Sequence, residues 1–324
     1  MHRPVLYHQI IHALRPSPAG HYVDCTLGAA GHAWGILEAS SPDGLLLGLD
    51  LDPQALEIAR TRLEPFGDRA ILRQASYTSL QEQLRALGWA AVNGIVLDLG
   101  VSSMQLDTPH RGFSFQSDAP LDMRFDPHAR LRASDLVNDL SEQELAQLLF
   151  RYGEEERARQ IARAIVRARP VHTTTELAAI LQNLGPSKPG FKGRQKKASG
   201  RLIHPATRTF QALRIAVNRE LDALESVLPQ SVDALAPGGR LAVIAFHSLE
   251  DRIVKQFFRR ESRDCLCPPR QPVCTCGHKA TLIEVTRRPV MPDPDEIAQN
   301  PRSRSARLRV AERVSDQTQF PAGT

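Results

Sequence analysis

The sequence lacks the features of a membrane or secreted protein. No apolar run approaches the roughly 20 residues that a membrane-spanning helix needs, and polar residues at His8, Gln9 and His12 interrupt any signal-like segment behind Met1. Aromatic residues make up only 5% of the chain, so the core should be mainly aliphatic. These absences predict a cytoplasmic globular protein with no membrane partner, although they leave its oligomeric state, monomer or homodimer, open.

Cysteine is also scarce, with five residues in 324, but four of them are clustered. Cys265, Cys267, Cys274 and Cys276 form a C-x-C-x6-C-x-C pattern, whereas Cys25 stands alone. In a cytosolic chain such clustering indicates metal rather than disulfides. The usual zinc knuckle is C-x2-C, however, so zinc and free thiols both stay open and no metal ligand is assigned.

Acidic residues are absent from positions 186–219, where nine Lys and Arg residues occur. Such a basic stretch is typical of a site for a polyanion, and equally of a solvated charged loop. Candidate phosphate ligands also occur near the C-terminus. The basic candidates are Lys196, Lys197, Arg201, Arg208, Arg214, Arg302, Arg304, Arg307 and Arg309.

The first hundred residues alternate between apolar runs and helical patterns. The apolar runs at 21–26, 45–51, 70–75 and 94–99 predict buried strands. The segments between them, ending near positions 40, 63 and 87, have helical spacing. This alternation predicts an open parallel sheet with helices on both faces.

The alternation then stops, and helical segments are expected at 133–138, 141–152, 154–169 and 174–183. Residues 186–200 are expected to be mobile. A long helix at 205–228 and strands at 240–246, 281–286 and 307–310 follow, the last two being expected at a sheet edge. The predicted fold is therefore an α/β domain, residues 1–108 and 206–324, interrupted by an inserted all-α domain, residues 109–205.

Residues with binding chemistry follow the predicted strands. Ligands of open parallel sheets bind at the carboxyl ends of the strands, and a carboxylate after the second strand can bind both ribose hydroxyls of a nucleoside. Asp50 has that position, Asp98 ends the fourth strand, and Asp52 is expected to cap a helix. The loop Gly28-x-x-Gly31-x-x-x-Gly35 is neither a dinucleotide fingerprint nor a P-loop. Small residues there would let a ligand approach the backbone, and a nucleoside without pyrophosphate, such as S-adenosylmethionine, fits best.

Motifs along nearly the whole chain resemble the bacterial 16S rRNA (cytosine-N4)-methyltransferase family, RsmH or MraW. They lie at residues 2–6, 24–32, 98–103, 105–107, 111–115, 121–124, 152–155, 204–212, 246–251 and 300–302. The resemblance implies a class I Rossmann-like methyltransferase sheet and the cofactor S-adenosylmethionine. It implies N4-methylation of a cytidine in the decoding (P-site) region of 16S rRNA, within the small ribosomal subunit, with the helical insertion helping to recognise RNA.

The resemblance also implies site residues. Asp98 is the catalytic candidate, as an acceptor for the cytosine amine, and the backbone carbonyls of residues 100–103 are the alternative acceptors. For Asp98 a role in cofactor binding is favoured over the catalytic one. His247 is either catalytic or structural. The family loop usually reads G-T-F-G-x-G-G-H, and this chain has Cys25 and Ala30 at two of its glycine positions. Alanine still permits close approach of a ligand, but it is expected to exclude positive φ, which bears on the loop geometry. The implied cofactor contacts are Ala30, Gly31, His32, Asp50, Tyr77, Asp98 and Gln105.

Two other functions remain as alternatives at this level. An NAD-dependent oxidoreductase could use the same fold, but the missing G-x-G-x-x-G motif argues against it. A non-catalytic ribosome- or RNA-binding factor could use the basic segment, but the intact cofactor crevice that the sequence predicts argues against it.

Overall fold

The computed structural model describes residues 4–185, 206–269, 271 and 273–315. The chain forms two compact units, residues 1–100 with 221–324, and residues 101–220. Each unit has its own hydrophobic core. Within the described ranges, no helix combines the length and the apolarity needed to cross a membrane.

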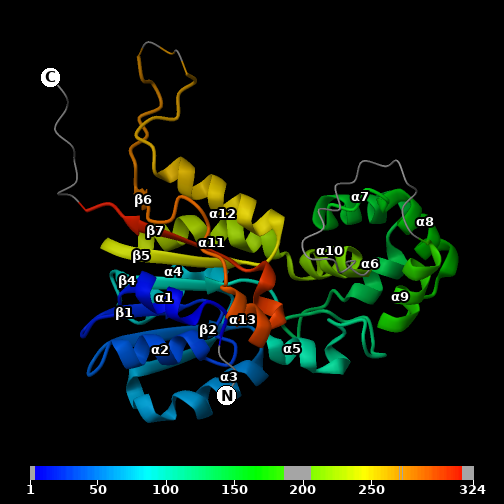
Figure 1. Ribbon diagram of the computed structural model, residues 1–324, viewed down its shortest axis with the longest axis horizontal. Helices are drawn as coiled ribbons and strands as arrows, with labels where there is room; N and C mark the ends of the chain where they lie inside the picture. The colour runs from blue at the N-terminus through cyan, green and yellow to red at the C-terminus, as the bar shows by residue number, and fades with distance from the viewer. Residues whose placement is uncertain (1–3, 186–205, 270, 272, 316–324) are drawn as a thin grey trace. The chain divides into compact units, whose positions relative to one another are not determined.

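The first unit contains a seven-stranded sheet with the order β3-β2-β1-β4-β5-β7-β6 (Figure 1). Strands β1 to β5 run parallel to one another, whereas β7 is antiparallel to β5 and β6 is antiparallel to β7. The predicted α/β fold is therefore confirmed. The strands are β1 (His21–Asp24), β2 (Leu45–Asp50), β3 (Ala70–Gln74), β4 (Val92–Asp98), β5 (Leu235–Ala245), β6 (Leu282–Glu284) and β7 (Arg307–Arg313).

Helices cover both faces of this sheet because its strands are apolar on both sides. One core packs α1 (Tyr7–Leu14), α2 (Gly31–Ala39) and α3 (Pro53–Leu63) against one face. The other packs α4 (Leu80–Ala86), α11 (Glu220–Ala234) and α12 (Ser248–Glu261) against the opposite face. The unit also contains α13 (Pro294–Gln299) and the short helices η1 (Glu64–Arg69), η2 (Tyr77–Ser79) and η4 (Pro301–Ser305).

The last strands differ in position from the sequence prediction. Only β6 lies at the sheet edge, whereas β7 lies between β5 and β6 and is largely buried. The alternating arginines of β7 are typical of an exposed edge strand, but Arg309 is buried and its charge is neutralised by Asp251 at 2.7 Å. A charged residue with a buried partner can thus occupy an interior strand.

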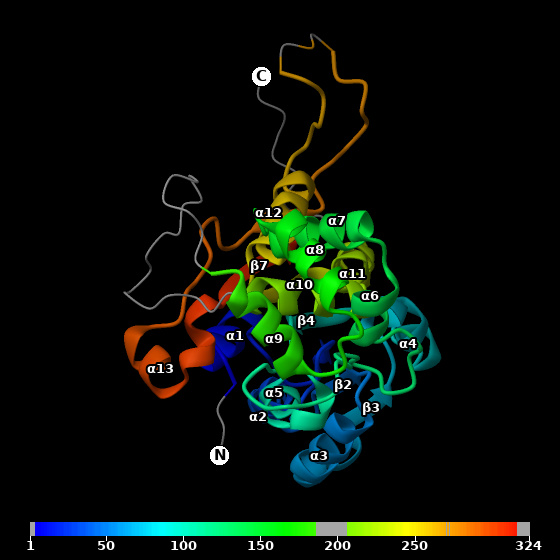
Figure 2. The same cartoon turned by 90° about the vertical axis from the view of Figure 1, so that its right-hand side faces the viewer.

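The second unit is helical, and its helices α6 to α10 lie together in Figure 2. Capping boxes begin α7 at Ser141 and α9 at Thr173, where the N-cap side chain and a glutamate exchange hydrogen bonds with backbone N–H groups. The helical segments predicted for 133–183 are confirmed. The elements are α5 (Ser103–Asp107), η3 (Pro109–Arg111), α6 (Ala133–Asp139), α7 (Glu142–Gly153), α8 (Ala158–Ala168), α9 (Thr174–Asn183) and α10 (Ala206–Asn218).

The single long helix predicted for 205–228 is wrong. The chain leaves the helix at Arg219, which has a φ of 51°, so α10 and α11 are separate helices. Asn218 stabilises the end of α10, since its side chain accepts a hydrogen bond from Phe125 N–H and donates one to the Met123 carbonyl. Sequence periodicity misses this break because both helices have the same apolar spacing.

The break also affects the domain boundaries. Phe210 and Leu213 of α10 are buried in the core of the helical unit, so α10 belongs to that unit. The structural divisions fall after Gly100 and Glu220, whereas the sequence suggested divisions after positions 108 and 205. The segment expected to be mobile, 186–200, lies outside the described residues.

Candidate active site

Three aspartates end three neighbouring parallel strands. Asp24 ends β1, Asp50 ends β2 and Asp98 ends β4, and β1 lies between the other two strands. Carboxyl ends of adjacent parallel strands meet at the same edge, which is where open α/β sheets bind ligands. The aspartates are close enough that the charges of Asp98 and Asp50 both raise the pKa of Asp24.

Asp50 anchors the loop that follows β1. Its Oδ2 accepts a hydrogen bond from Gly28 N–H at 2.8 Å, and its Oδ1 accepts one from Asp52 N–H at 2.9 Å. Each carboxylate oxygen can accept a further bond, so Asp50 can position the loop and still bind ligand hydroxyls. Burial raises the pKa of Asp50, and these backbone donors oppose that rise. Asp52 caps α3, as expected, by accepting from Gln54 N–H.

Ala30 contradicts the expectation that alanine excludes positive φ from this loop. It has a φ of 57° and a ψ of 33° at the N-cap of α2, and its side chain is fully buried. The left-handed conformation costs a non-glycine residue about 1–2 kcal/mol. Burial of the methyl group offsets part of this cost, so the loop keeps a left-handed turn without glycine.

Two loop glycines have a packing role, and their expected ligand-approach role stays a prediction. A Cβ at Gly31 would come within 2.8 Å of the Pro4 ring, and one at Gly35 within 2.5 Å of the Tyr7 hydroxyl. The N-terminal segment therefore occupies the space that these glycines leave. Gly28, with a φ of 49°, is required for the turn itself.

His32 and Asp98 form the most unusual polar pair in this unit. His32 Nε2 lies 3.5 Å from Asp98 Oδ2, and the imidazole is buried beside the ring of Tyr7. Asp98 Oδ1 and both ring nitrogens of His32 are buried without a hydrogen-bond partner among the described residues. Because buried polar atoms are nearly always paired, this arrangement fits a polar ligand. Asp98 N–H donates to Thr26 Oγ1 at 2.6 Å, which fixes the end of β4 to the loop after β1.

Asp24 is a site residue that the sequence reasoning missed. Its side chain is 1% exposed, and burial raises its pKa from 3.8 to about 6, with the nearby His32 opposing the rise. At neutral pH it is therefore mostly an ionised, poorly solvated carboxylate. Its place at a strand end, equivalent to Asp50 and Asp98, is the signal that could have identified it.

The remaining expected site residues are more scattered. Tyr77 begins η2 directly after β3 and is half-buried against the core. Gln105 belongs to the helical unit, where its side chain accepts from Ser102 N–H in the capping box of α5, and its cofactor role stays a prediction. His247 caps α12, with Nδ1 accepting from Glu250 N–H and Nε2 3.0 Å from Glu250 Oε1. Because His247 Nε2 is also buried without a hydrogen bond among the described residues, its catalytic and structural interpretations both stay open.

Several arginines expected to contact phosphate already have carboxylate partners. Arg214 makes two 2.8 Å hydrogen bonds to Glu220. Arg307 and Arg309 both pair with Asp251, at 3.0 and 2.7 Å. These ion pairs hold the pKa of Asp251 below its usual range, against its burial. These three arginines are therefore structural cations.

The fold and site define the class of this protein. The sheet has five parallel strands and is completed by the antiparallel β7–β6 pair. Acidic residues end β1, β2 and β4, and the loop after β1 has no dinucleotide fingerprint. These features are those of a Rossmann-like, S-adenosylmethionine-dependent methyltransferase. Residues 1–314 match the model of the MraW methylase family, and the chain belongs to that family.

Relatives in several bacteria agree with this assignment. The chain is 52% identical over 317 residues to the ribosomal RNA small subunit methyltransferase H of Thermomicrobium roseum, covering 97% of this chain and 94% of the relative. It is 51% identical over 316 residues to the protein of the same name in Geobacter sulfurreducens, covering 97% and 99%. For that of Dehalococcoides mccartyi the identity is 50% over 313 residues, covering 97% and 86%. The protein is thus an rRNA methyltransferase, and the oxidoreductase and non-catalytic alternatives are wrong.

Proposed function

We propose that this enzyme methylates N4 of a cytidine in the decoding (P-site) region of 16S rRNA, within the small ribosomal subunit. Family membership along nearly the whole chain is the observation that carries this proposal. The names of the relatives support the small subunit as the context of the reaction. We further propose that the enzyme acts in the bacterial cytoplasm, where ribosomal subunits assemble.

The acidic strand ends support the assigned cofactor contacts. Asp50 binds the ribose hydroxyls with its remaining acceptor capacity, and Tyr77 stacks on the adenine. The carboxylates of Asp24 and Asp98 create a negative potential that favours the cationic sulfonium centre. The full set of proposed contacts is Ala30, Gly31, His32, Asp50, Tyr77, Asp98 and Gln105.

When bound, S-adenosylmethionine supplies an electrophilic methyl group. The chain must align the acceptor nitrogen in line with the carbon–sulfur bond, and such positioning accounts for much of the catalysis. The cofactor would transfer its methyl to N4 and leave as the thioether, which would keep the electron pair of the broken carbon–sulfur bond. The N4 amine becomes cationic and loses a proton. Asp98 Oδ1, buried without a partner among the described residues, is the proposed acceptor for that N–H.

The helical unit is proposed to recognise the RNA around the target base. The basic segment at 186–201, which lies outside the described residues, would contact phosphates through its lysines and arginines. A cytosine stacked in a helix must be exposed before its amine can react, so an unpaired or loosely stacked cytidine requires the least energy.

Mass-spectrometric mapping of rRNA nucleosides from cells with and without the gene tests the proposed product. We expect N4-methylation of one 16S cytidine to disappear in the deletion strain and to return on complementation. Loss of a methyl group at another base, or from large-subunit rRNA, would contradict the proposed specificity while leaving the methyltransferase assignment intact.

Single-turnover kinetics with purified small subunits separate the two roles of Asp98. If Asp98 accepts the amine proton, Asp98→Asn should lower the methyl-transfer rate at saturating cofactor by at least 100-fold. If Asp98 only binds cofactor, its substitution should raise the cofactor Kd and leave the saturated rate unchanged. Asp43→Asn, at the exposed turn before β2, is the matched control.

A further inference from the structure

The segment between α12 and β6 folds without a hydrophobic core. Among its described residues from 262 to 280 none is buried, and Leu266 and Val273 are 37% and 71% exposed. This excursion, residues 262–281, extends away from the sheet as the loop above α12 and β6 in Figure 1. Since apolar burial cannot stabilise it, another interaction must fix its conformation.

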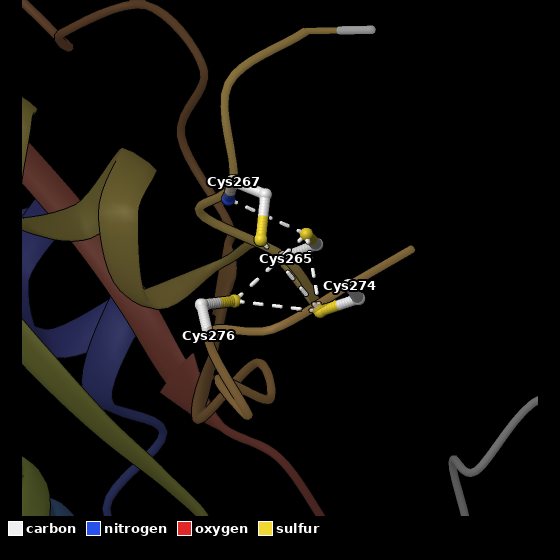
Figure 3. Close-up of side chains that lie close together, drawn as sticks. All are labelled: Cys265, Cys267, Cys274 and Cys276. Atoms are coloured by element: carbon white, nitrogen blue, oxygen red, sulfur yellow. Dashed lines mark hydrogen bonds between the residues drawn. The ribbon is translucent and has the colours of Figure 1, made fainter. Parts of the chain in front are cut away.

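Four cysteines meet at the base of the excursion (Figure 3). The sulfurs of Cys265, Cys267, Cys274 and Cys276 all lie within 4.8 Å of one another. The sulfur of Cys274 lies 3.4 Å from that of Cys265, 3.5 Å from that of Cys276 and 3.9 Å from that of Cys267. The sulfurs of Cys265 and Cys276 are 3.8 Å apart. A disulfide bond is about 2.05 Å long, so these sulfurs are not covalently paired.

The separations fit four thiolates around one ion. With Zn–S bonds of about 2.3 Å, the corners of a tetrahedron lie about 3.8 Å apart. A cluster of several metal ions with bridging sulfides would hold its cysteines farther apart than this. His278 follows the last cysteine but is not needed as a ligand, because its Nε2 lies 3.2 Å from the Arg260 carbonyl oxygen.

Backbone N–H groups point at the sulfurs in a reciprocal pattern. Leu266 N–H, between the first two cysteines, donates to Cys276 Sγ at 3.3 Å. Thr275 N–H, between the last two, donates to Cys267 Sγ at 3.4 Å. Donors of this kind stabilise the negative charge of thiolates and orient them as metal ligands. The two C-x-C turns thus form equivalent halves of one site, which explains how a spacing unlike C-x2-C can work.

We propose that Cys265, Cys267, Cys274 and Cys276 bind a structural zinc ion that fixes the base of the excursion. Four protein ligands leave no open coordination position, so the ion has no catalytic role. The thiols release their protons to solvent as the metal binds. The sheet does not depend on the ion, because Val254, Phe258 and Leu282 anchor α12 and β6 in the core. Loss of zinc should therefore unfold the excursion alone.

Metal analysis of the full-length protein, purified without chelators, tests the site. We expect one zinc per chain in the wild type and in the Cys25→Ser control, whose buried cysteine lies outside the cluster. The double variant Cys265→Ser/Cys274→Ser should contain less than one tenth of that amount. X-ray absorption should show four sulfur neighbours at about 2.3 Å. Zinc retained in the double variant, or reduced wild-type protein that takes up neither Zn²⁺ nor Co²⁺, would overturn the proposal. Stoichiometric iron would overturn the assignment to zinc.

Limited proteolysis tests the structural role independently of metal content. Trypsin can cut at the exposed Arg263 and Lys279, on either side of the cluster. A strong chelator should accelerate these cuts at least tenfold in the wild type, and added zinc should reverse the effect. The double variant should be cut rapidly with or without metal. Equal resistance of the metal-loaded and metal-free wild type would refute the claim that the ion holds the excursion.

Discussion

Replacing Asp24 by asparagine should make the cofactor-free enzyme more stable at neutral pH. Asparagine has nearly the same shape and can still accept the 3.1 Å hydrogen bond from Thr26 N–H, so the substitution mainly removes a buried charge. That charge is unfavourable because burial, the largest influence on this group, raises the Asp24 pKa from 3.8 to about 6. A raised pKa means that the folded protein binds the proton more tightly than the unfolded chain does.

The size of the effect follows from the linkage between protonation and folding. At about 1.4 kcal/mol per pKa unit, ionising Asp24 in the folded protein costs about 3 kcal/mol at pH 7. Near pH 4.5 the folded protein keeps the proton, and the cost falls to about 1 kcal/mol. The stability advantage of Asp24→Asn over the wild type should therefore grow by about 2 kcal/mol between pH 4.5 and pH 7.

Urea denaturation of both proteins at several pH values measures this difference. Asp52→Asn serves as the control, since asparagine caps helices about as well as aspartate and should change stability by less than about 0.5 kcal/mol. By calorimetry, Asp24→Asn should bind S-adenosylmethionine about fivefold more weakly, because a carboxylate near the cation is lost. A stability difference that stays constant or shrinks as the pH rises would refute the electrostatic reasoning.

Three further perturbations address the cofactor, the helical unit and the RNA. Asp50→Asn should weaken S-adenosylmethionine binding by about 10- to 100-fold in calorimetry. Unchanged affinity would remove the ribose assignment. Since the amide oxygen can accept from only one of the two N–H groups, of Gly28 and Asp52, the melting temperature should also fall, and affinity is compared well below it. Glu220→Ala should destabilise the protein by about 3 kcal/mol in denaturation, because it removes a two-hydrogen-bond ion pair from a largely buried arginine. Glu142→Ala, which breaks a mostly exposed pair, should cost less than about 1 kcal/mol, and equal losses would contradict the role of burial. Neutralising the basic cluster should weaken RNA binding and should lower by about 2 the slope of the logarithm of the binding constant against the logarithm of the salt concentration. A slope identical to that of the wild type would make that segment a linker. The cluster is Lys196, Lys197 and Arg201.

The helices and strands were largely predictable because they follow from local patterns. Apolar runs fixed the positions of β1 to β4, and the capping box at Ser141 marked the start of α7. Asp50 and Asp98 could be placed at one sheet edge, because the ends of neighbouring parallel strands must meet there. Arg219 shows the limit of such patterns, since its positive φ interrupts a helical spacing that continues on both sides.

Functional roles were less predictable where they depend on distant contacts. The sequence contains the glycines of the loop, but only packing shows that Gly31 and Gly35 make room for Pro4 and Tyr7. Similarly, Arg214 looks like a phosphate ligand until Glu220 is seen beside it.

The sequence by itself determined the family, the α/β pattern and the edge of the sheet where the acidic strand ends meet, because these depend on residue type and local spacing. Only the tertiary structure decided that Asp24 carries a raised pKa, that Ala30 adopts a left-handed conformation and that four cysteines converge. Desolvation and tetrahedral geometry depend on which residues surround an atom, and the folded chain brings those residues together from positions far apart in the sequence.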